Sequence, residues 1–235
     1  MKTKLEVCID SANGIEACLT GKADRIELCS SLHLGGLTPS IELMRLAANC
    51  TLPVHAMIRP KGGDFHFSYL DMLQMLADID SARLAGLEGV VLGVTMKNGR
   101  IDEKALKILS DRASGMGKTL HRVVDSISNP VDAIEIAIGL GFDCILSSGG
   151  AEIAINGLRV LNKMQDKADG RIEIMPGSGI NASNVEEIIS NFKPNWVHSS
   201  CSSQFQNREE LNELEFEKNL TSFIDSKKII SLKNA

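Results

Sequence analysis

The sequence has no apolar run that approaches the ~20 residues of a membrane span, and it has no cluster of lysine and arginine. Its 25 basic residues are dispersed among 30 acidic ones, and aromatic residues make up only 4% of the chain. Proteins that bind nucleic acid or anionic membranes usually carry basic clusters interleaved with aromatic side chains, so we expect neither partner. Because a strand pattern follows Met1 directly, we expect a soluble, cytoplasmic protein.

Closely spaced cysteines are missing as well. The chain has six cysteines, and no two of them form a C-x-x-C pair. Scattered cysteines are typical of reduced thiols inside the cell, and they argue against a disulfide framework and against a structural zinc site.

The sequence does contain a regular alternation of short apolar segments with amphipathic stretches of helical length. The segments that predict strands span residues 5–10, 25–29, 54–58, 89–94, 118–123, 144–146, 172–175 and 196–198. Eight such units without a linker favour a single-domain TIM (β/α)8 barrel over residues 1–235, ahead of a doubly wound open sheet. The last helix is expected at 208–223, and the tail 225–235 is expected to be loosely held.

The segment HAMIRPKGGDF at residues 55–65 indicates where a site is expected. Period-2 alternation places His55, Met57 and Arg59 on one face of the strand. Pro60 then ends the strand, and the glycines at 62 and 63 begin a flexible loop. In parallel α/β proteins ligands bind where the strands end, so we expect a site at this edge.

Charged and imidazole side chains recur near several predicted strand ends. The set comprises Glu6, Asp10, Glu27, His55, Arg59, His121, Arg122 and Asp125. One interpretation is a polar plug in which acids pair with arginines, and the other is a catalytic or ligand site, since burying unpaired charge is costly. In a site, Glu27 or His55 could act as general base. Arg59 or Arg122 could either hold an anionic group by a bidentate contact or neutralise the neighbouring acids.

Small residues follow the last two predicted strands, at Gly177, Ser178 and Gly179 and at Ser199. In (β/α)8 barrels these two loops commonly form a phosphate site, where backbone amides and a helix N-terminus favour negative charge. Glycine-rich loops also serve as plain strand-to-helix turns. An anion-binding site and a structural turn are therefore both open interpretations.

Two thiols occupy equivalent positions on neighbouring predicted strands. Cys8 and Cys29 could approach within ligand distance, with the thioether of Met57 near them. Soft sulfur donors suit Cu(I), which makes this pair a candidate metal site. The alternative is that both are small buried residues, because cysteine is commonly buried and no ligand spacing is present.

Several segments resemble the CutC copper homeostasis protein family. They are LEVCIDS at 5–11, DRIELC at 24–29, LGGLTPS at 34–40, MIRPKGGDF at 57–65 and IMPGSG at 174–179. The resemblance implies a TIM barrel, a cytoplasmic location and a homo-oligomer. In the family, copper binding is attributed to the cysteines that match Cys8 and Cys29, so it also implies Cu(I) as a ligand. It implies neither an organic cofactor nor an established catalytic activity.

The sequence departs from the family pattern in four segments. Residues 177–179 read GSG where a triple glycine is usual, residues 198–200 read HSS where HAS or similar is usual, and the other two departures lie at 120–125 and 146–149. Residues 120–125 read LHRVVD where FHRAFD is usual, and residues 146–149 read LSSG where LTSG is usual. The polar residues are kept, so we expect the same chemistry at the end of the barrel but not necessarily the same ligand shape. Two functions stay open: a copper homeostasis protein that binds Cu(I), and a TIM-barrel enzyme acting on a small anionic or phosphorylated metabolite.

Overall fold

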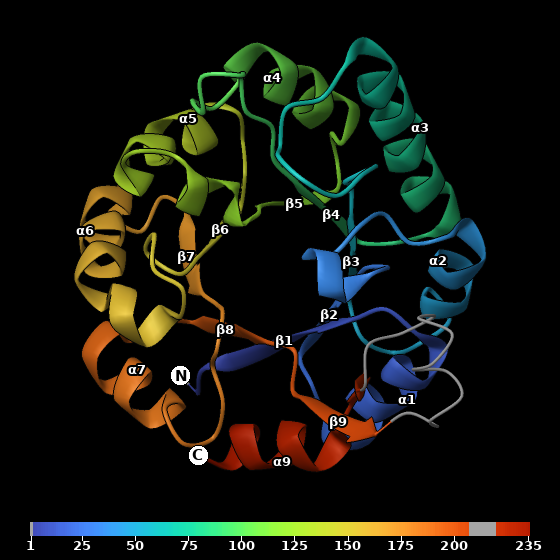
Figure 1. Ribbon diagram of the computed structural model, residues 1–235, viewed down its shortest axis with the longest axis vertical. Coiled ribbons are helices and arrows are strands. Elements are labelled where there is room, and N and C mark those ends of the chain that lie inside the picture. The colour runs from blue at the N-terminus through green and yellow to red at the C-terminus, as the bar shows by residue number, and fades with distance from the viewer. Residues whose placement is uncertain (1, 207–219) are drawn as a thin grey trace.

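The structure, a computed structural model, describes residues 2–206 and 220–235 and contains a nearly closed barrel of eight parallel strands (Figure 1). The strands are β1 (Lys4–Ile9), β2 (Arg25–Leu28), β3 (Val54–Met57), β4 (Gly89–Leu92), β5 (Gly117–Leu120), β6 (Cys144–Ser147), β7 (Glu173–Pro176) and β8 (Trp196–Ser199). Hydrogen bonds join them in the order β7-β6-β5-β4-β3-β2-β1-β8, and β7 and β8 at the ends of this order lie side by side. The predicted (β/α)8 barrel is confirmed, and the alternative of a doubly wound open sheet is not.

Helices surround the barrel on the outside (Figure 1). They are α1 (Ala12–Gly21), α2 (Ile41–Ala47), α3 (Tyr69–Ala85), α4 (Glu103–Arg112), α5 (Ala133–Gly139), α6 (Leu158–Ala168), α7 (Val185–Phe192) and α9 (Ser226–Asn234). Short 3-10 turns lie in the loops after the strands: η1 (Leu32–Leu34), η2 (Arg122–Ser126), η3 (Pro130–Asp132) and η4 (Ala154–Gly157). Within residues 2–206 and 220–235, no helix combines the length and the apolar character that crossing a membrane requires.

Alternation along each strand divides its residues between two buried environments. On β2 and β3, Ile26, Leu28 and Ala56 belong to the apolar core between the strands and the helices. Glu27 and His55 alternate with them and are also buried, but they face the inside of the barrel. The polar residues of the strands therefore converge inside the barrel.

Helix α3 is capped at both ends. The Ser68 hydroxyl accepts a hydrogen bond from the Asp71 amide at 3.2 Å, and the Asp71 carboxylate accepts one from the Ser68 amide at 2.8 Å. This capping box starts the helix, and Gly86, with φ +91°, ends it. The caps fix where the loop that follows β3 ends.

The strand predicted at 118–123 is too long. Strand β5 ends at Leu120, and the chain then turns into η2. His121 stabilises the turn, because its Nδ1 accepts a hydrogen bond from the Val123 amide at 3.1 Å. Such a local side-chain bond competes with the strand ladder. Arg122 consequently leaves the sheet.

The helix predicted at 208–223 is not supported where it can be compared. Residues 208–219 lie outside the described residues, and residues 220–223 belong to strand β10 (Leu220–Ile224). This strand pairs antiparallel with β9 (Ser202–Gln206) in a separate two-stranded sheet.

The tail 225–235 is helical rather than loosely held. Helix α9 buries Ile229 and Leu232, and it packs against α1. The close approach depends on Gly21, since a Cβ at that position would lie 2.5 Å from Cβ of Ile229. Apolar burial, which the short sequence pattern did not suggest, therefore holds the C-terminus in place.

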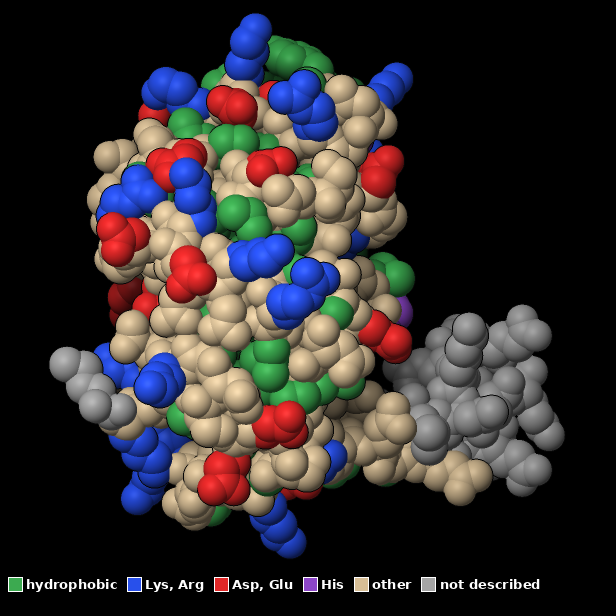
Figure 2. Space-filling view, turned by 90° about the vertical axis from the view of Figure 1, so that its left-hand side faces the viewer, with side chains coloured by type: hydrophobic (Ala, Val, Ile, Leu, Met, Phe, Trp, Pro, Cys, Tyr) green, Lys and Arg blue, Asp and Glu red, His purple; other side chains and the backbone are tan. Residues whose placement is uncertain are grey.

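The surface carries charges of both signs close together. Figure 2 shows one face, on which lysine and arginine side chains alternate with aspartate and glutamate and small apolar areas lie between them. On this face the charges form no broad patch of one sign.

Candidate functional site

The mouth of the barrel, at the carboxyl ends of the strands, contains a cavity of about 360 Å³. This volume lies at the small end of the range for ligand pockets. Its wall comprises Cys8, Glu27, Leu32, Gly35, Met57, Arg59, Phe65, His121, Arg122, Leu146, Ser178, Gly179, Ile180, His198, Ser199 and Ser200. The structure thus brings together eight residues that the sequence predicts for the site: Cys8, Glu27, Arg59, His121, Arg122, Ser178, Gly179 and Ser199.

Three potential metal ligands meet on one side of this cavity. The Cys8 thiol, the Glu27 carboxylate and the His198 imidazole offer ligand atoms that all lie within 4.8 Å of one another, and all three residues are buried. Cys8 on β1 pairs with Glu27 on β2, and β8 pairs with β1 on the other side. Bonds of about 2.0–2.3 Å to one ion place three ligands roughly 3.3–4.0 Å from one another. A small movement therefore lets one ion contact all three.

Glu6 orients the imidazole of His198. The Nδ1 of His198 lies 2.8 Å from Oε1 of Glu6, which leaves Nε2 to face the cavity, 3.8 Å from Oε2 of Glu27. Burial alone would raise the pKa of Glu6, but the cation of Arg25 and the hydrogen bond from His198 lower it to about 2. For His198 the effect of burial has the opposite sign and lowers the pKa. Glu27, Cys8 and Glu6 outweigh it and together raise the pKa of His198 well above its usual value.

Glu27 is only partly satisfied. Its Oε2 accepts a weak hydrogen bond from the Cys29 thiol at 3.7 Å, whereas the buried Oε1 has no partner among the described residues. Burial and the nearby charge of Glu6 raise the pKa of Glu27, although His198 opposes them. Burial and, to a lesser extent, the charge of Glu27 raise the pKa of the Cys29 thiol well above its usual value. Cys29 thus contacts Glu27, one of the three potential metal ligands, but it does not line the cavity.

Arg59 joins two loops above the cavity. Its guanidinium donates to the carbonyls of Leu34 (2.8 Å), Gly36 (3.1 Å) and Gly63 (2.8 Å), and it lies over the ring of Phe65 at 4.8 Å. Within the described residues it makes no ion pair with a carboxylate, and its buried Nε has no partner. Arg59 thus ties the loop after β2 to the loop after β3, and it does not neutralise the acids as one interpretation held.

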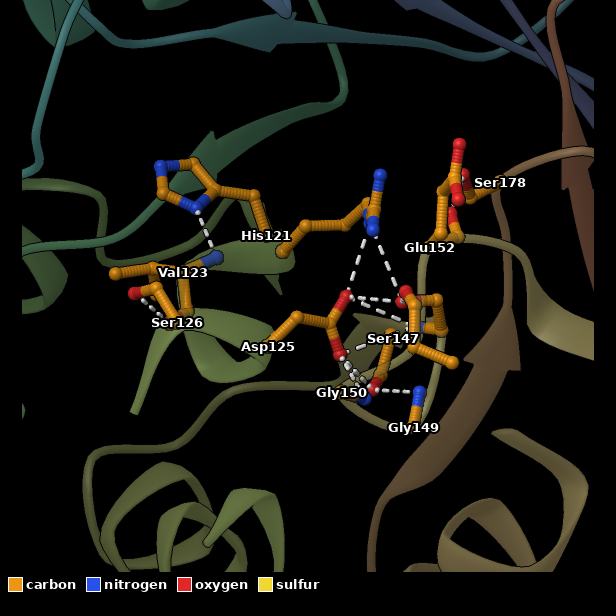
Figure 3. Close-up of polar contacts among 12 residues, drawn as sticks. His121, Val123, Asp125, Ser126, Ser147, Gly149, Gly150, Glu152 and Ser178 are labelled. Carbon is orange, nitrogen blue, oxygen red and sulfur yellow. Dashed lines mark hydrogen bonds and ion pairs between the residues drawn. The ribbon is translucent and has the colours of Figure 1, made fainter. Parts of the chain in front are cut away.

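Asp125 anchors the loops after β5 and β6 (Figure 3). Its carboxylate accepts hydrogen bonds from the Ser147 hydroxyl at 2.6 Å, from the amide and hydroxyl of Ser148 at 2.9 Å, and from the Gly150 amide at 3.0 Å. Nε of Arg122 adds a further bond at 2.9 Å. A carboxylate bonded in this way holds Arg122 in place and does not line the cavity.

In the loop after β7, the Ser178 side chain is engaged in a hydrogen bond within the protein, so only backbone groups could contact a ligand. The Ser178 hydroxyl donates to the Glu152 carbonyl at 2.8 Å (Figure 3), and the Gly177 amide donates to the Ser147 carbonyl at 3.0 Å. At the end of β8, the Ser199 hydroxyl donates to the Ile180 carbonyl at 2.7 Å. The side chains predicted to bind an anion therefore stabilise the loops themselves.

His55 and Asp10 lie away from the cavity wall. The His55 ring fits deeper in the barrel against Gly89, where a Cβ would come within 2.5 Å of it. Burial and, to a lesser extent, the positive charge of Arg25 lower the pKa of His55 to about 4. The ring is therefore neutral at neutral pH. The exposed Asp10 instead accepts a hydrogen bond from the Leu32 amide at 3.2 Å.

His198 is the residue that the sequence analysis misses. A single histidine at the end of the last strand carries little signal by itself. One indication is its position along the strand. In the register of β1 and β8, His198 lies opposite Glu6, which already belongs to the predicted charged set.

Fold and site together define a (β/α)8-barrel protein whose mouth gathers metal-ligating and cationic side chains. The chain belongs to the CutC family, whose model matches residues 3–203. A CutC family protein of Rhizobium meliloti (strain 1021) is 50% identical over 202 residues, which cover 86% of this chain and 82% of the relative. Another, of Vibrio atlanticus (strain LGP32), is 47% identical over 206 residues, covering 86% and 83%.

Solved structures agree with this assignment. The crystal structure of a candidate copper homeostasis protein CutC from Streptococcus agalactiae has a TM-score of 0.80 at 29% identity, covering 84% of this chain and 98% of its own. N-(5'-phosphoribosyl)anthranilate isomerase from Pyrococcus furiosus has a TM-score of 0.61 at 18% identity, covering 99% and 97%, and shows the fold alone.

Proposed function

We propose that this CutC-family protein serves copper homeostasis in the cytoplasm by binding Cu(I) in the barrel mouth. The observation that carries the proposal is the buried group of Cys8, Glu27 and His198, whose ligand atoms lie within 4.8 Å of one another. The Glu6 carboxylate behind His198 supports it, because metal-bound histidines almost always bond a carboxylate, a backbone carbonyl or water through their other ring nitrogen.

The donor chemistry fits copper and does not exclude zinc. Thiolate and imidazole both bind copper, and Cys29 and Met57 add soft sulfur atoms in a small cluster next to the group. The Glu27 carboxylate is a harder ligand that also suits Zn²⁺. We assign Cys8 and His198 as the principal ligands and keep Cys29 as an additional thiol.

The test is a titration of the reduced protein with Cu(I) against a competing chelator. We expect Cys8→Ser and His198→Gln to weaken binding at least ~10-fold and Cys29→Ser to have a smaller effect. Cys50→Ser, a half-buried cysteine outside the cavity wall, is the matched control. A wild-type affinity no better than that of the Cys8→Ser/His198→Gln variant would refute copper binding, and tighter binding of Zn²⁺ would reassign the metal.

A second candidate is an enzyme acting on a small anionic or phosphorylated metabolite. It is favoured by buried polar atoms of the cavity wall that have no partner among the described residues: Oε1 of Glu27, Nε of Arg59 and Nε2 of His121. Unpartnered buried polar atoms are rare, and a ligand is one way to satisfy them. Mass spectrometry of small molecules released on denaturation tests this candidate, and an empty cavity in freshly purified protein would count against it.

We also propose that the protein is a homo-oligomer, which the family resemblance supports. Light scattering of the eluted protein gives the mass directly. A mass close to the 25.4 kDa of one chain would refute this part of the proposal.

A further inference from the structure

We infer that the barrel mouth contains an oxyanion subsite formed by the free edge of Arg122 and by the backbone amides of Ser178, Gly179 and Ile180. It would take a small molecule that carries a carboxylate or phosphate group. This inference deepens the second candidate function and is independent of metal binding.

Arg122 supplies a fixed cation. Its Nε donates to Asp125 at 2.9 Å and its Nη2 donates to the Ser148 hydroxyl at 2.9 Å, which holds the plane of the guanidinium. Nη1 has no partner among the residues described, and 40% of the side chain is exposed where it lines the cavity. A guanidinium held by one edge presents its other N–H groups in a geometry that suits a carboxylate or phosphate.

His121 supplies a buried donor without an acceptor. Its Nδ1 accepts a hydrogen bond from the Val123 amide, so the neutral ring carries its proton on Nε2. The residue is 3% exposed, it lines the cavity, and Nε2 has no partner in the described part of the chain. Burial, with Arg59 next, lowers the pKa of His121 to about 3, which keeps the ring neutral. An unpartnered buried N–H is costly. Figure 3 shows His121 and Ser178 on opposite sides of the view, so this donor would meet another acceptor of the ligand and not the anionic group at the loop after β7.

The loop after β7 supplies a row of backbone donors. The amides of Ser178, Gly179 and Ile180 donate to no other described residue, and all three residues line the cavity. Ser178 has φ +82° and Gly179 has φ +68°, and the Ala154 amide holds the loop through the Ser178 carbonyl at 3.0 Å. Strained backbone next to a cavity is typical of functional sites.

The chemistry of these groups defines the ligand. All of them are hydrogen-bond donors, so the matching group is rich in acceptors and negatively charged. The same cavity also carries Cys8, Glu27 and His198, and its volume of about 360 Å³ limits the ligand to a small molecule. A small organic acid and a phosphate ester share the required anionic group.

The test uses the native chain without added metal, titrated with inorganic phosphate and, separately, with succinate. We expect at least one anion to bind and to shift the NMR signals of the Ser178, Gly179 and Ile180 amides. Arg122→Gln should weaken that binding at least ~10-fold, and Arg122→Lys should weaken it less. Arg171→Gln is the matched control, since Arg171 is similarly exposed at 44% and also pairs with a carboxylate.

The two anions distinguish the sources of the charge, because a phosphate-specific response indicates a phosphate ester and a succinate-specific response an organic acid. Failure of both anions to bind, unchanged binding in Arg122→Gln, or signal shifts away from the loop after β7 would overturn the inference. Binding without any turnover would leave the subsite standing while the enzyme function fails.

Discussion

Glu6 and His198 are joined by a hydrogen bond of 2.8 Å although 192 residues separate them in the sequence. The register of β1 and β8 places the two residues opposite each other. Glu6 is also paired with Arg25, so one buried carboxylate serves both a cation and the imidazole that faces Cys8 and Glu27.

The first prediction concerns this shared carboxylate. Glu6→Gln should lower Cu(I) affinity by roughly 10- to 100-fold, because His198 loses the group that orients it. It should also cost about 3–5 kcal/mol of unfolding free energy, since Arg25 is left buried without its partner. Arg25→Met is the control: it breaks the same ion pair but keeps the Glu6–His198 bond, so its affinity for Cu(I) should fall less. Equal losses of affinity in the two variants would contradict the orienting role.

The second prediction concerns acid stability. The pKa of His55 falls from 6.5 to about 4 in the folded protein, so below pH 6.5 only the unfolded chain takes up this proton. The contribution of His55 is therefore complete above pH 6.5 and is lost as the pH decreases towards 4, with a total of roughly 3 kcal/mol.

Urea unfolding of the wild type and of His55→Gln measures this effect at several pH values between about 7 and about 4.5. The stability difference between the two proteins should shrink as the pH falls. Glu27, whose raised pKa acts in the opposite direction, is present in both proteins and cancels in the difference. A difference that is constant with pH would contradict the prediction.

The third prediction concerns Arg59. Arg59→Met removes the donors to the carbonyls of Leu34, Gly36 and Gly63, so we expect a loss on the order of 3 kcal/mol and faster hydrogen exchange in the loops after β2 and β3. Cu(I) affinity should stay within a few-fold of the wild type. An unchanged melting temperature together with lost ligand binding would instead show that Arg59 clamps a ligand.

The fourth prediction compares two glycines with the same backbone conformation. Gly179 has φ +68° and Gly170 has φ +70°, but a Cβ at Gly179 would lie 2.5 Å from Cγ2 of Ile153, whereas a Cβ at Gly170 has no atom within 4 Å. Gly170→Ala should cost about 1–2 kcal/mol of unfolding free energy from the backbone alone. Gly179→Ala should cost a further ~1–3 kcal/mol from the clash, and equal costs would refute the close packing.

The fold was predictable because its signal is repeated. Each unit shows the same change from a short apolar segment to an amphipathic stretch, and caps such as Ser68 with Asp71 mark helix starts. The errors occur where one side chain or one distant contact decides. His121 ends β5 early through its own ring, and α9 depends on burial against α1, which no local pattern reveals.

The residues of the candidate site were easier to predict than the hydrogen bonds that they make. Cys8, Glu27 and Arg59 were predicted as site residues from their positions on the strands, and they do line the cavity. Which partner each side chain selects depends on distances between strands, so the bonds of Arg59 to carbonyls could not be deduced. The role of His198 depends on the pairing of the last strand with the first, which sequence periodicity does not encode.

That pairing also determines when the site can exist during synthesis. Cys8 and Glu27 are made early, but the imidazole that completes their group belongs to residue 198, near the end of the barrel. A ribosome-bound chain therefore carries an unfinished thiol and carboxylate until β8 joins β1, and contacts between such distant residues form slowly. A metal site that uses all three side chains would therefore require the finished barrel, and a nascent or truncated chain lacks it.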